Sequence, residues 1–298
     1  MGSEIFATSR ERALQMLRRA PVLHLASAGL DGSPLGGAVD FVVHDGAVRI
    51  DAPGLAHAGR RAVLSAERTI AVLPDGSSTW VERVRLRGVL EADVPYVRMP
   101  LAALEGESRV GQELAPEARR AVLERLWRRG LPGDPAAIER ARDARPDTPT
   151  PEFLRGPAGT TLVCALDERA VDAAVELLAN EYWNAGVPRD VIAAALLGSE
   201  AWVGARDAEG RLVANARAIG DGAKVAWIFD VTVRRDWRGR GLGQAVMRLL
   251  LDHPVARGVR RVLLDTRDAQ RLYQGFGFVD RATVPRPYPS TQMVLKRA

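Results

Sequence analysis

The sequence predicts an α+β protein of two domains, a β-rich first domain and a mixed α/β second domain. A length of 298 residues fits two domains of ~100–200 residues each. Short apolar runs separated by glycine and aspartate turns fill the first part of the chain, whereas strand and helix patterns alternate in the last part. Between them, residues 145–159 (RPDTPTPEFLRGPAG) are rich in proline and glycine. We therefore expect domains at 1–157 and 158–298.

The first domain is predicted to be a small β-barrel with a helical tail. Residues 8–19 have an apolar stripe at helical spacing, with Thr8 or Ser9 as the N-cap. The stripe consists of Ala13, Met16 and Leu17. After this helix, the stretch VLHLASAGLDGSPLGGAVDFVVHDGAVRIDAP alternates apolar runs with GLDG and HDG turns, which join antiparallel strands.

The rest of this domain is expected to close the barrel and to end in helices. A short helix around 55–65 and strands near 69–73 and 80–91 would complete the barrel. Residues 116–144 show two helical patterns divided by the breaker GLPGDP.

The second domain is predicted to contain a mixed sheet. We expect strands at TTLVCAL, AWVGAR, RLVANARAI, VAWIFDVTV and VRRVLLDT, and helices at ERAVDAAVELLANEYW, near 188–197, at QAVMRLLLDHP and at DAQRLYQGF. Three consecutive strands joined by tight turns are followed by a loop, a helix, a strand, a helix and a final strand. That order differs from a doubly wound sheet.

Composition excludes several classes of function. The net charge of +5 and the pI near 9.9 suggest nucleic-acid binding, but arginines and acids are interspersed, as in VERVRLRGVLEAD, so nucleic acid is not expected. No run of ~18 apolar residues exists, and the N-terminus lacks the apolar core of a secretion signal. We expect a cytoplasmic protein with no membrane partner.

The metal-binding residue types are sparse. Cys164 is the single cysteine, which excludes an internal disulfide and a multi-cysteine metal site. It is expected to be a small buried side chain. His24 and His44 are isolated and are interpreted as structural, so no metal is expected.

The stretch RRDWRGRGLGQAVM (234–247) carries the clearest functional signal. Helix N-termini bind phosphate because their first amides lack partners and the helix dipole is positive there. Gly239, Gly241 and Gly243 let the backbone approach a bulky anion, and Arg238 and Arg240 supply charge. A Walker lysine is absent, and the spacing is not that of a dinucleotide GxGxxG. A turn rich in arginine and glycine that merely precedes a helix is the alternative.

The pattern Arg238-x-x-Gly241-x-Gly243 after VAWIFDVTV resembles motif A of the GNAT superfamily of N-acetyltransferases. The later segment LLDTRDAQRLYQGFGF resembles motif B of the same superfamily, and ANEYWNAGVPRDVIAAALLGSEAWVGARD resembles one of its branches. The resemblance covers about 160–298. It implies a GNAT fold and an acetyl-CoA-dependent N-acetyltransferase that acts on an unidentified small-molecule or peptide amine.

The resemblance also implies roles for particular residues. The amides of one loop would hold the pyrophosphate of acetyl-CoA: Arg238, Gly239, Arg240, Gly241, Leu242 and Gly243. The main chain of Val231, Thr232 and Val233 would pair with the acetyl carbonyl and the pantetheine arm. Tyr273 would protonate the departing thiolate, since a phenol of pKa ~10 is close to a thiol of ~8.5. Asp268 stands where many members have asparagine, and a contact to the cofactor is expected from it.

The base that would deprotonate the amine is left open among Glu181, Asp230 and Asp265. Asp230 lies between apolar neighbours in a strand, where its side chain needs a partner or must face a cleft. Glu181, Tyr182 and Trp183 close a helix that often lines the acceptor side in this superfamily. An acid that caps a loop, and ordinary helix-end packing, are the alternatives.

The first domain resembles the split-barrel flavoproteins related to pyridoxamine 5′-phosphate oxidase. The resemblance rests on VLHLASAGLDGSPLGGAVDFVVHDGAVRIDAP, GRRAVLSAERTIAV and RVRLRGVLEAD, with a helical tail typical of one branch. It implies an FMN-binding split barrel that commonly forms homodimers. However, LGGAVDF has no cation. PGLAHAG, where a lysine or arginine ordinarily takes the flavin phosphate, is short and uncharged apart from His57, and the possible substitutes Arg60 and Arg61 fall a helical turn late. A phosphate without cations binds poorly, so FMN is not expected.

Three functions follow. The first is an acetyl-CoA-dependent N-acetyltransferase whose barrel serves as scaffold, dimerisation surface or acceptor-binding module. The second is an FMN-dependent oxidoreductase or flavin-binding protein with an accessory acyl-CoA-binding domain. The third is a non-catalytic acyl-CoA-binding regulator, which would not need the Tyr273 hydroxyl.

Overall fold

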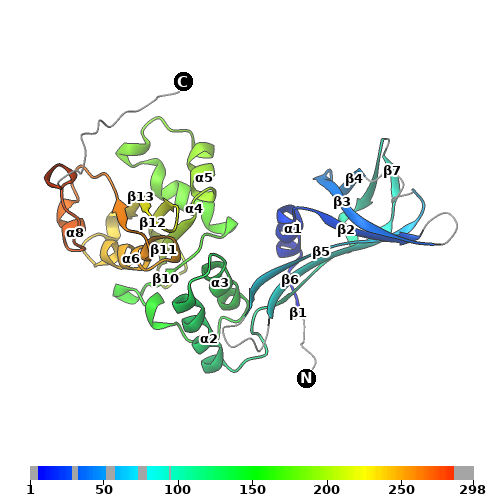
Figure 1. The fold of residues 1–298 in the computed structure, drawn as a ribbon, viewed down its shortest axis with the longest axis horizontal. Coiled ribbons are helices and arrows are strands. Elements are labelled where there is room, and N and C mark those ends of the chain that lie inside the picture. The colour runs from blue at the N-terminus through cyan, green and yellow to red at the C-terminus, as the bar shows by residue number, and fades with distance from the viewer. Residues whose placement is uncertain (1–5, 29–32, 52–57, 73–78, 94, 285–298) are drawn as a thin grey trace. The chain divides into compact units, whose positions relative to one another are not determined.

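The chain divides into two compact units in the computed structural model, which describes residues 6–28, 33–51, 58–72, 79–93 and 95–284 (Figure 1). Unit 1 comprises Met1–Arg155 with Val163–Leu166, and unit 2 comprises Gly156–Leu162 with Asp167–Ala298.

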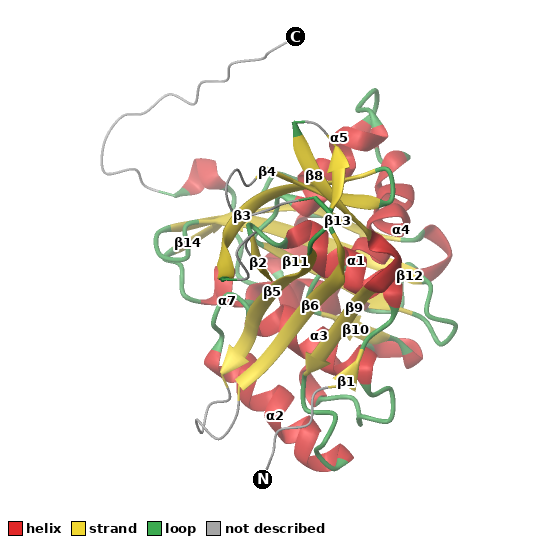
Figure 2. Ribbon diagram, turned by 90° about the vertical axis from the view of Figure 1, so that its right-hand side faces the viewer, coloured by secondary structure: helices red, strands yellow, loops and turns green. Residues whose placement is uncertain are grey.

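Unit 1 is built on one antiparallel sheet. Its strands are β1 (Phe6–Ala7), β2 (Leu23–Ala28), β3 (Pro34–His44), β4 (Ala47–Asp51), β5 (Arg61–Val72), β6 (Thr79–Val89), β7 (Glu91–Asp93), β8 (Tyr96–Pro100) and β9 (Leu104–Arg109). Their order is β1-β9-β6-β5-β2-β3-β4-β8-β7, and β5 and β6 form a long twisted ribbon (Figure 2). No pairing between β1 and β7 closes the sheet within the described residues, so the split barrel stays a prediction.

Helix α1 (Arg10–Arg19) packs on this sheet as its apolar stripe predicts. The Ser9 hydroxyl caps the helix by accepting a hydrogen bond from the Arg12 amide, and the residue before Pro21 is extended, which ends the helix. Ala13, Met16 and Leu17 are buried in a core cluster with side chains from β2 to β6, β8 and β9. The predicted helix and its Ser9 cap are confirmed.

The short helix expected around 55–65 is wrong from Arg61 onward, because β5 begins there. Its Ala62 and Leu64 are buried on one face, and every residue from Arg61 to Thr69 pairs with β6. Cross-strand pairing over this length outweighs the helical preference of alanine, leucine and arginine. His57 and most of PGLAHAG lie outside the described residues.

The helical tail of unit 1 follows the predicted breaker. Helix α2 (Pro116–Arg129) ends at Gly130, whose φ of 70° gives a left-handed C-cap, and α3 (Asp134–Ala144) follows. Buried Arg119 donates hydrogen bonds to the Gly111 and Leu114 carbonyls and to Thr148, which fixes the connector to α2.

Unit 2 is a mixed five-stranded sheet with helices on it. Its strands are β10 (Thr161–Val163), β11 (Ala201–Arg206), β12 (Leu212–Gly220), β13 (Val225–Val233) and β14 (Arg261–Leu263), in the order β10-β11-β12-β13-β14. Its helices are α4 (Glu168–Ala179), α5 (Arg189–Leu197), α6 (Leu242–Leu251), α7 (Pro254–Arg257) and α8 (Gln270–Gln274).

The sheet of unit 2 is covered on both faces. Along β11 and β12, side chains that point to either face of the sheet are buried. Helix α6 packs on β11, β12 and β13, whereas α4 packs on β12 and β13. The β11–β13 pairs are antiparallel, and β13 pairs in parallel with β14. The mixed sheet predicted for the second domain is therefore present; residues 285–298, after the last helices, lie outside the described residues.

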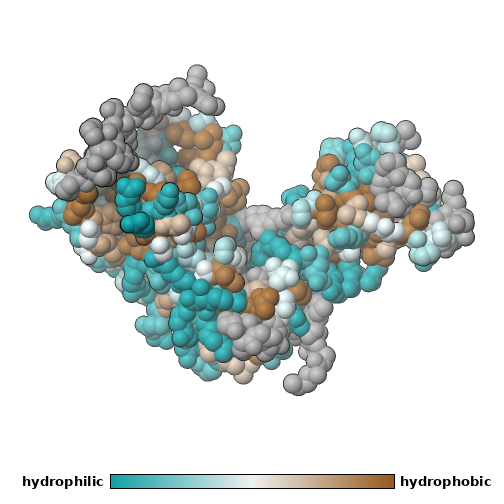
Figure 3. Space-filling view, in the orientation of Figure 1, coloured by the Kyte–Doolittle hydropathy of each residue, from teal (hydrophilic) through white to brown (hydrophobic). Residues whose placement is uncertain are grey.

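On the face shown in Figure 3, hydrophilic residues are interspersed with hydrophobic ones on each unit. Among the described residues, none of the helices has both the length and the apolar character needed to cross a membrane.

Candidate functional site

The loop between β13 and α6 presents a row of backbone amides. Gly239 and Gly241 have φ values of 76° and 82°, and Gly241 is the N-cap of α6. Within the described residues, the amides from Gly239 to Gln244 donate to no protein acceptor. A Cβ on Gly241 would meet Pro157 at 3.6 Å, an ordinary contact, so the left-handed backbone rather than lack of space requires glycine there. The loop has the form of an anion-binding turn.

The two arginines of the loop are held by their neighbours. Arg238 donates through Nε to the Val233 carbonyl at 3.0 Å and through Nη2 to Glu181 Oε1 at 3.2 Å. The Arg240 guanidinium lies 4.8 Å from the ring centroid of Trp237. Both cations therefore stay beside the row of amides.

One edge of β13 is open over its second half. β14 pairs only with Val225, Ala226 and Trp227, although the sequence predicted a longer strand here. From Ile228 to Val233, no described strand pairs with that edge. Because the open edge runs directly into the amide loop, an extended ligand bound there would lie along main-chain hydrogen-bonding groups and end at an anion site.

A β-bulge lies within this open segment. Arg217 of β12 pairs with Phe229, and Asn215 pairs with Thr232, so Asp230 and Val231 face a single residue of β12. Asp230 has a φ of 55°, which is rare for a residue other than glycine. The Asn215 side chain is fully buried and donates to the Asp230 carbonyl at 2.7 Å, which stabilises the bulge.

Both carboxylate oxygens of Asp230 accept hydrogen bonds. Oδ2 accepts from Arg217 Nε at 2.5 Å and Oδ1 from Trp183 Nε1 at 2.9 Å. Arg217 also donates to the Ser199 hydroxyl and lies 4.8 Å from the Phe229 ring centroid. The sequence predicted that the carboxylate of Asp230 would need a partner or face a cleft among its apolar neighbours, and Arg217 is such a partner. Through its other oxygen, Asp230 also holds Trp183 against β13.

Glu181 joins the end of α4 to the same strand and loop. The predicted helix through Trp183 stops at Ala179, and a 3₁₀ turn at Tyr182–Asn184 follows. Oε1 of Glu181 accepts from Thr232 Oγ1 at 2.9 Å and from Arg238, whereas Oε2 has no partner within the described residues. Glu181 thus has one oxygen without a hydrogen bond among the described residues, whereas each oxygen of Asp230 accepts one.

Tyr273 lies on α8 with its ring buried and packed edge-on against Phe278, at 6.0 Å between centroids. Burial raises the pKa of the Tyr273 phenol, and the neighbouring Tyr182 and Asp268 raise this pKa further. The phenol is therefore fully protonated at neutral pH. Its hydroxyl makes no hydrogen bond to another described residue.

Aromatic rings and a cation connect α8 to the turn after α4. Arg267 lies 3.6 Å from the centroid of the Tyr182 ring, and Tyr182 packs edge-on against Trp183. Tyr182, Trp183 and Phe229 are each more than a third exposed. The exposed rings border the open segment of β13, since Trp183 bonds to Asp230.

The structure brings most of the predicted residues into one region of unit 2. Glu181 and Trp183 contact the strand and loop that carry the predicted cofactor residues, and Tyr182 lies near enough to Tyr273 to raise its pKa. Asp268 is exposed and pairs with Arg267 at 3.3 Å. Asp265 is exposed, and it forms no hydrogen bond or ion pair with another described residue.

Sequence reasoning missed Arg217 and Asn215. The signal for both was available, since asparagine and arginine interrupt the apolar run of RLVANARAI. Arg217 gave no indication of its partner because the bulge in the neighbouring strand decides which residue it meets.

A family of known proteins matches the part of the chain that carries these residues. Residues 169–278 match the model of the Acetyltransferase (GNAT) family. A curated relative, glucosamine 6-phosphate N-acetyltransferase 1 of Oryza sativa subsp. japonica, is 32% identical over 87 residues, or 29% of this chain and 53% of the relative. The chain therefore spans about half the length of this curated relative. Residues 169–278, which lie in unit 2, are thus similar to GNAT acetyltransferases.

Two solved structures are similar to parts of this chain. A protein of Xanthomonas campestris pv. campestris, described as belonging to the GNAT family, is 30% identical with a TM-score of 0.37, over 43% of this chain and 93% of its own. The FAD binding protein of Mycobacterium smegmatis is 16% identical with a TM-score of 0.29, over 36% of this chain and 99% of its own.

Proposed function

We propose that unit 2 transfers an acetyl group from acetyl-CoA to an amine. The observation that carries this proposal is the continuity of the open β13 edge with the amides that begin α6, which donate to no acceptor among the described residues. A thioester with a long polar arm and a pyrophosphate needs these two features side by side, a strand edge for the arm and an anion turn for the phosphates.

The residues that would bind acetyl-CoA follow from this arrangement. The amides from Gly239 to Gly243 would hold the pyrophosphate, with the Arg238 and Arg240 side chains beside it. Val231 lies on the open edge, where its main chain would bond to the pantetheine arm and the acetyl carbonyl. The main chain of Thr232, which the sequence also suggested for this role, pairs with Asn215 of β12 and faces away from the open edge. The Val233 carbonyl already accepts from Arg238, so we assign its amide, rather than its carbonyl, to the arm. Asp268 pairs with Arg267, so a contact of Asp268 with acetyl-CoA would replace this ion pair.

The chemistry needs two proton transfers. The neutral amine nitrogen attacks the thioester carbon, the carbon–sulfur bond breaks, and an amide and the CoA thiolate form. Tyr273 donates its hydroxyl proton to the thiolate. The nitrogen loses its extra proton to a base, and we assign this step to Oε2 of Glu181, because Asp230 has both oxygens engaged.

Asp230 then acts as a positioning residue. It fixes Trp183 against the bulge and keeps Arg217 neutralised. The exposed rings of Tyr182, Trp183 and Phe229 would contact the acceptor. The acceptor class remains a small-molecule or peptide amine; the curated relative is named for glucosamine 6-phosphate, which makes this amine one member of the test panel.

Three further expectations belong to the same proposal: unit 1 carries no flavin, the protein acts in the cytoplasm, and it forms a homodimer. The visible spectrum and the sedimentation coefficient of the purified chain test the first and the last.

The first experiment is calorimetric titration of the full chain with acetyl-CoA, followed by thiol release in a panel of amines. We expect micromolar binding and acetyl-CoA consumption that depends on one class of amine. A chain that does not bind acetyl-CoA would contradict the proposal. A chain that binds it but turns over none of the amines would favour the non-catalytic regulator.

A further inference from the structure

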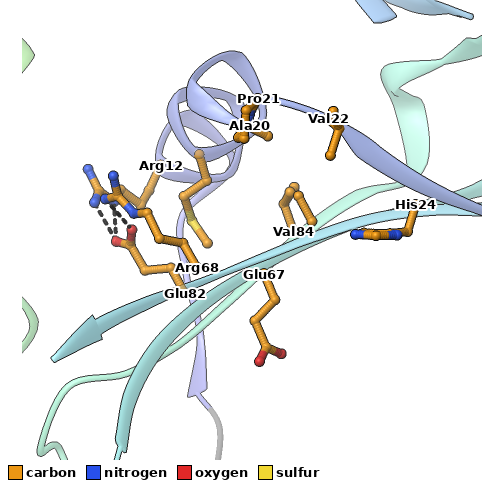
Figure 4. A pocket seen from close by; sticks show the side chains of 11 residues that line it. Arg12, Ala20, Pro21, Val22, His24, Glu67, Arg68, Glu82 and Val84 are labelled. Carbon is orange, nitrogen blue, oxygen red and sulfur yellow. Dashed lines mark hydrogen bonds and ion pairs between the residues drawn. The ribbon is translucent and has the colours of Figure 1, made fainter. Parts of the chain in front are cut away.

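A cavity of about 380 Å³ lies in unit 1 between α1 and the face of the sheet formed by β2, β5 and β6 (Figure 4). Its volume is within the range of small-molecule sites. The lining residues are Arg12, Met16, Ala20, Pro21, Val22, His24, Ala66, Glu67, Arg68, Glu82 and Val84. None of the residues assigned to acetyl transfer belongs to this unit.

One end of the cavity holds more positive than negative charge. Arg12 of α1 and Arg68 of β5 both bond to the carboxylate of Glu82, and Arg140 of α3 approaches Glu82 at 3.3 Å. Burial raises the pKa of Glu82, but the three guanidiniums outweigh burial and hold this pKa below its ordinary value. Glu82 is therefore ionised at neutral pH. One carboxylate neutralises only one of the two arginine charges that line the cavity.

The second carboxylate in the lining does not offset this excess. Glu67 points away from α1 in Figure 4 and accepts a hydrogen bond from Arg83 at 2.7 Å. Arg68 is half exposed, and beyond its Nη2 bond to Glu82 its Nε and Nη1 donate to no described residue. A guanidinium with free donors at the mouth of a cavity is suited to a carboxylate.

The wall beside this charged end is apolar. Met16, Ala20 and Val22 approach from α1 and the chain after it, and Ala66 and Val84 approach from the sheet. His24 lies at the end opposite the arginines (Figure 4). An occupant that satisfies both parts has an anionic head and an apolar body.

We propose that this cavity binds a small monocarboxylate with an aliphatic body, the carboxylate on Arg68 and Arg12 and the chain against Met16, Val22 and Val84. A monoanion matches the single uncompensated charge, whereas a phosphate dianion needs more cations than the two that line the site.

The test is calorimetric titration of the full chain with octanoate, octanol and octyl phosphate. We expect octanoate to bind with a submillimolar Kd and the other two compounds to bind at least ~10-fold more weakly, because a charge-assisted hydrogen bond to a monoanion is what the site offers. Tighter binding of octyl phosphate than of octanoate, or equal binding of octanol, would overturn the proposal.

Two variants with the same change of charge locate the site. Arg68→Leu removes the free donors but leaves Glu82 paired with Arg12 and Arg140, so the fold is retained. Arg83→Leu removes an arginine from the opposite side of the same sheet. We expect the first variant to weaken octanoate binding at least ~10-fold and leave octanol unchanged, and the second to bind octanoate as the parent chain does. Equal effects of the two variants would show that octanoate binds elsewhere. Circular dichroism of each variant confirms that it is folded.

Discussion

Replacing Tyr273 with phenylalanine tests the proposed mechanism most directly. The ring is 7% exposed and packs on Phe278, and both features survive the change. The hydroxyl has no hydrogen bond to a described residue, so we expect the free energy of unfolding to change by less than about 1 kcal/mol. A loss of activity would then report on the hydroxyl itself rather than on the fold.

The size of the loss follows from the environment of the phenol. General acids contribute roughly 10²–10⁴-fold to rate. Because burial raises the pKa of Tyr273, proton donation to a thiolate is less favourable than for an ordinary phenol, and the open strand edge admits water as a substitute. We therefore expect a loss near ~10²-fold in kcat, equivalent to about 3 kcal/mol of transition-state stabilisation.

The assay is thiol release from acetyl-CoA with the best amine of the panel, measured from pH 6 to about 10.5, the upper limit being set by the ordinary phenol pKa of ~10. The raised pKa keeps Tyr273 in its donor form to higher pH than an ordinary phenol, so deprotonation of Tyr273 should not lower the parent activity up to pH ~10. The loss of kcat in Tyr273→Phe should therefore be the same at every pH from 6 to ~10. Tyr182→Phe is the matched control, since its ring keeps the contact with Arg267. An unchanged kcat in Tyr273→Phe, or an equal loss in Tyr182→Phe, would refute the assignment of Tyr273 as the acid.

Three other predictions concern the loop, the buried carboxylate of unit 1 and a buried histidine. Gly241→Ala and Gly210→Ala both put a side chain on a left-handed backbone, at φ values of 82° and 81°, so each should cost about 1 kcal/mol in stability. Only the Gly241 change should weaken acetyl-CoA binding in calorimetry, and equal affinities would argue against the loop as the phosphate site. Glu82→Gln should lower the free energy of unfolding at pH 7 by about 3 kcal/mol, because three guanidiniums lose their common anion. The difference from the parent chain should shrink as pH falls below the ordinary carboxyl pKa of ~4.3 toward the lower native value, and urea titrations at several pH values measure it. Burial and the charge of Arg257 lower the pKa of His253 from 6.5 to about 4, so the unfolded chain binds more protons between these values. Stability should therefore fall by roughly 3 kcal/mol as pH drops from 6.5 to 4; a His253→Asn variant should lack this component, and an NMR titration of His253 with a midpoint near 6.5 would contradict it.

Local chemistry explains the parts of the molecule that the sequence predicted well. The cap of α1, the left-handed break after α2 and the strands of unit 2 depend on residues close in the chain, through capping, glycine conformation and hydrophobic period. The anion turn belongs to the same class, because Gly239 and Gly241 adopt the positive φ that their composition allows.

The features that the sequence did not predict depend on contacts between residues far apart in the chain. β5 is a strand rather than a helix because β6 pairs along it, and β14 is short enough to leave half of β13 open. The sequence left Glu181, Asp230 and Asp265 as equal candidates for the base. In the structure, Asp230 lies in the bulge of β13 and accepts hydrogen bonds through both oxygens, whereas Glu181 has one oxygen without a partner among the described residues. Asp265 is not part of the bulge.

The sequence by itself determined the alternation of strands and helices in unit 2, the glycine turn before α6 and the position of Tyr273 after it, since each is encoded within a few neighbouring residues. Only the tertiary structure decided which carboxylates are already paired and where the chain leaves a strand edge or a cavity open. Arg12, Arg68 and Glu82 are far apart in the chain, and they meet because α1 packs on β6 and β6 pairs with β5.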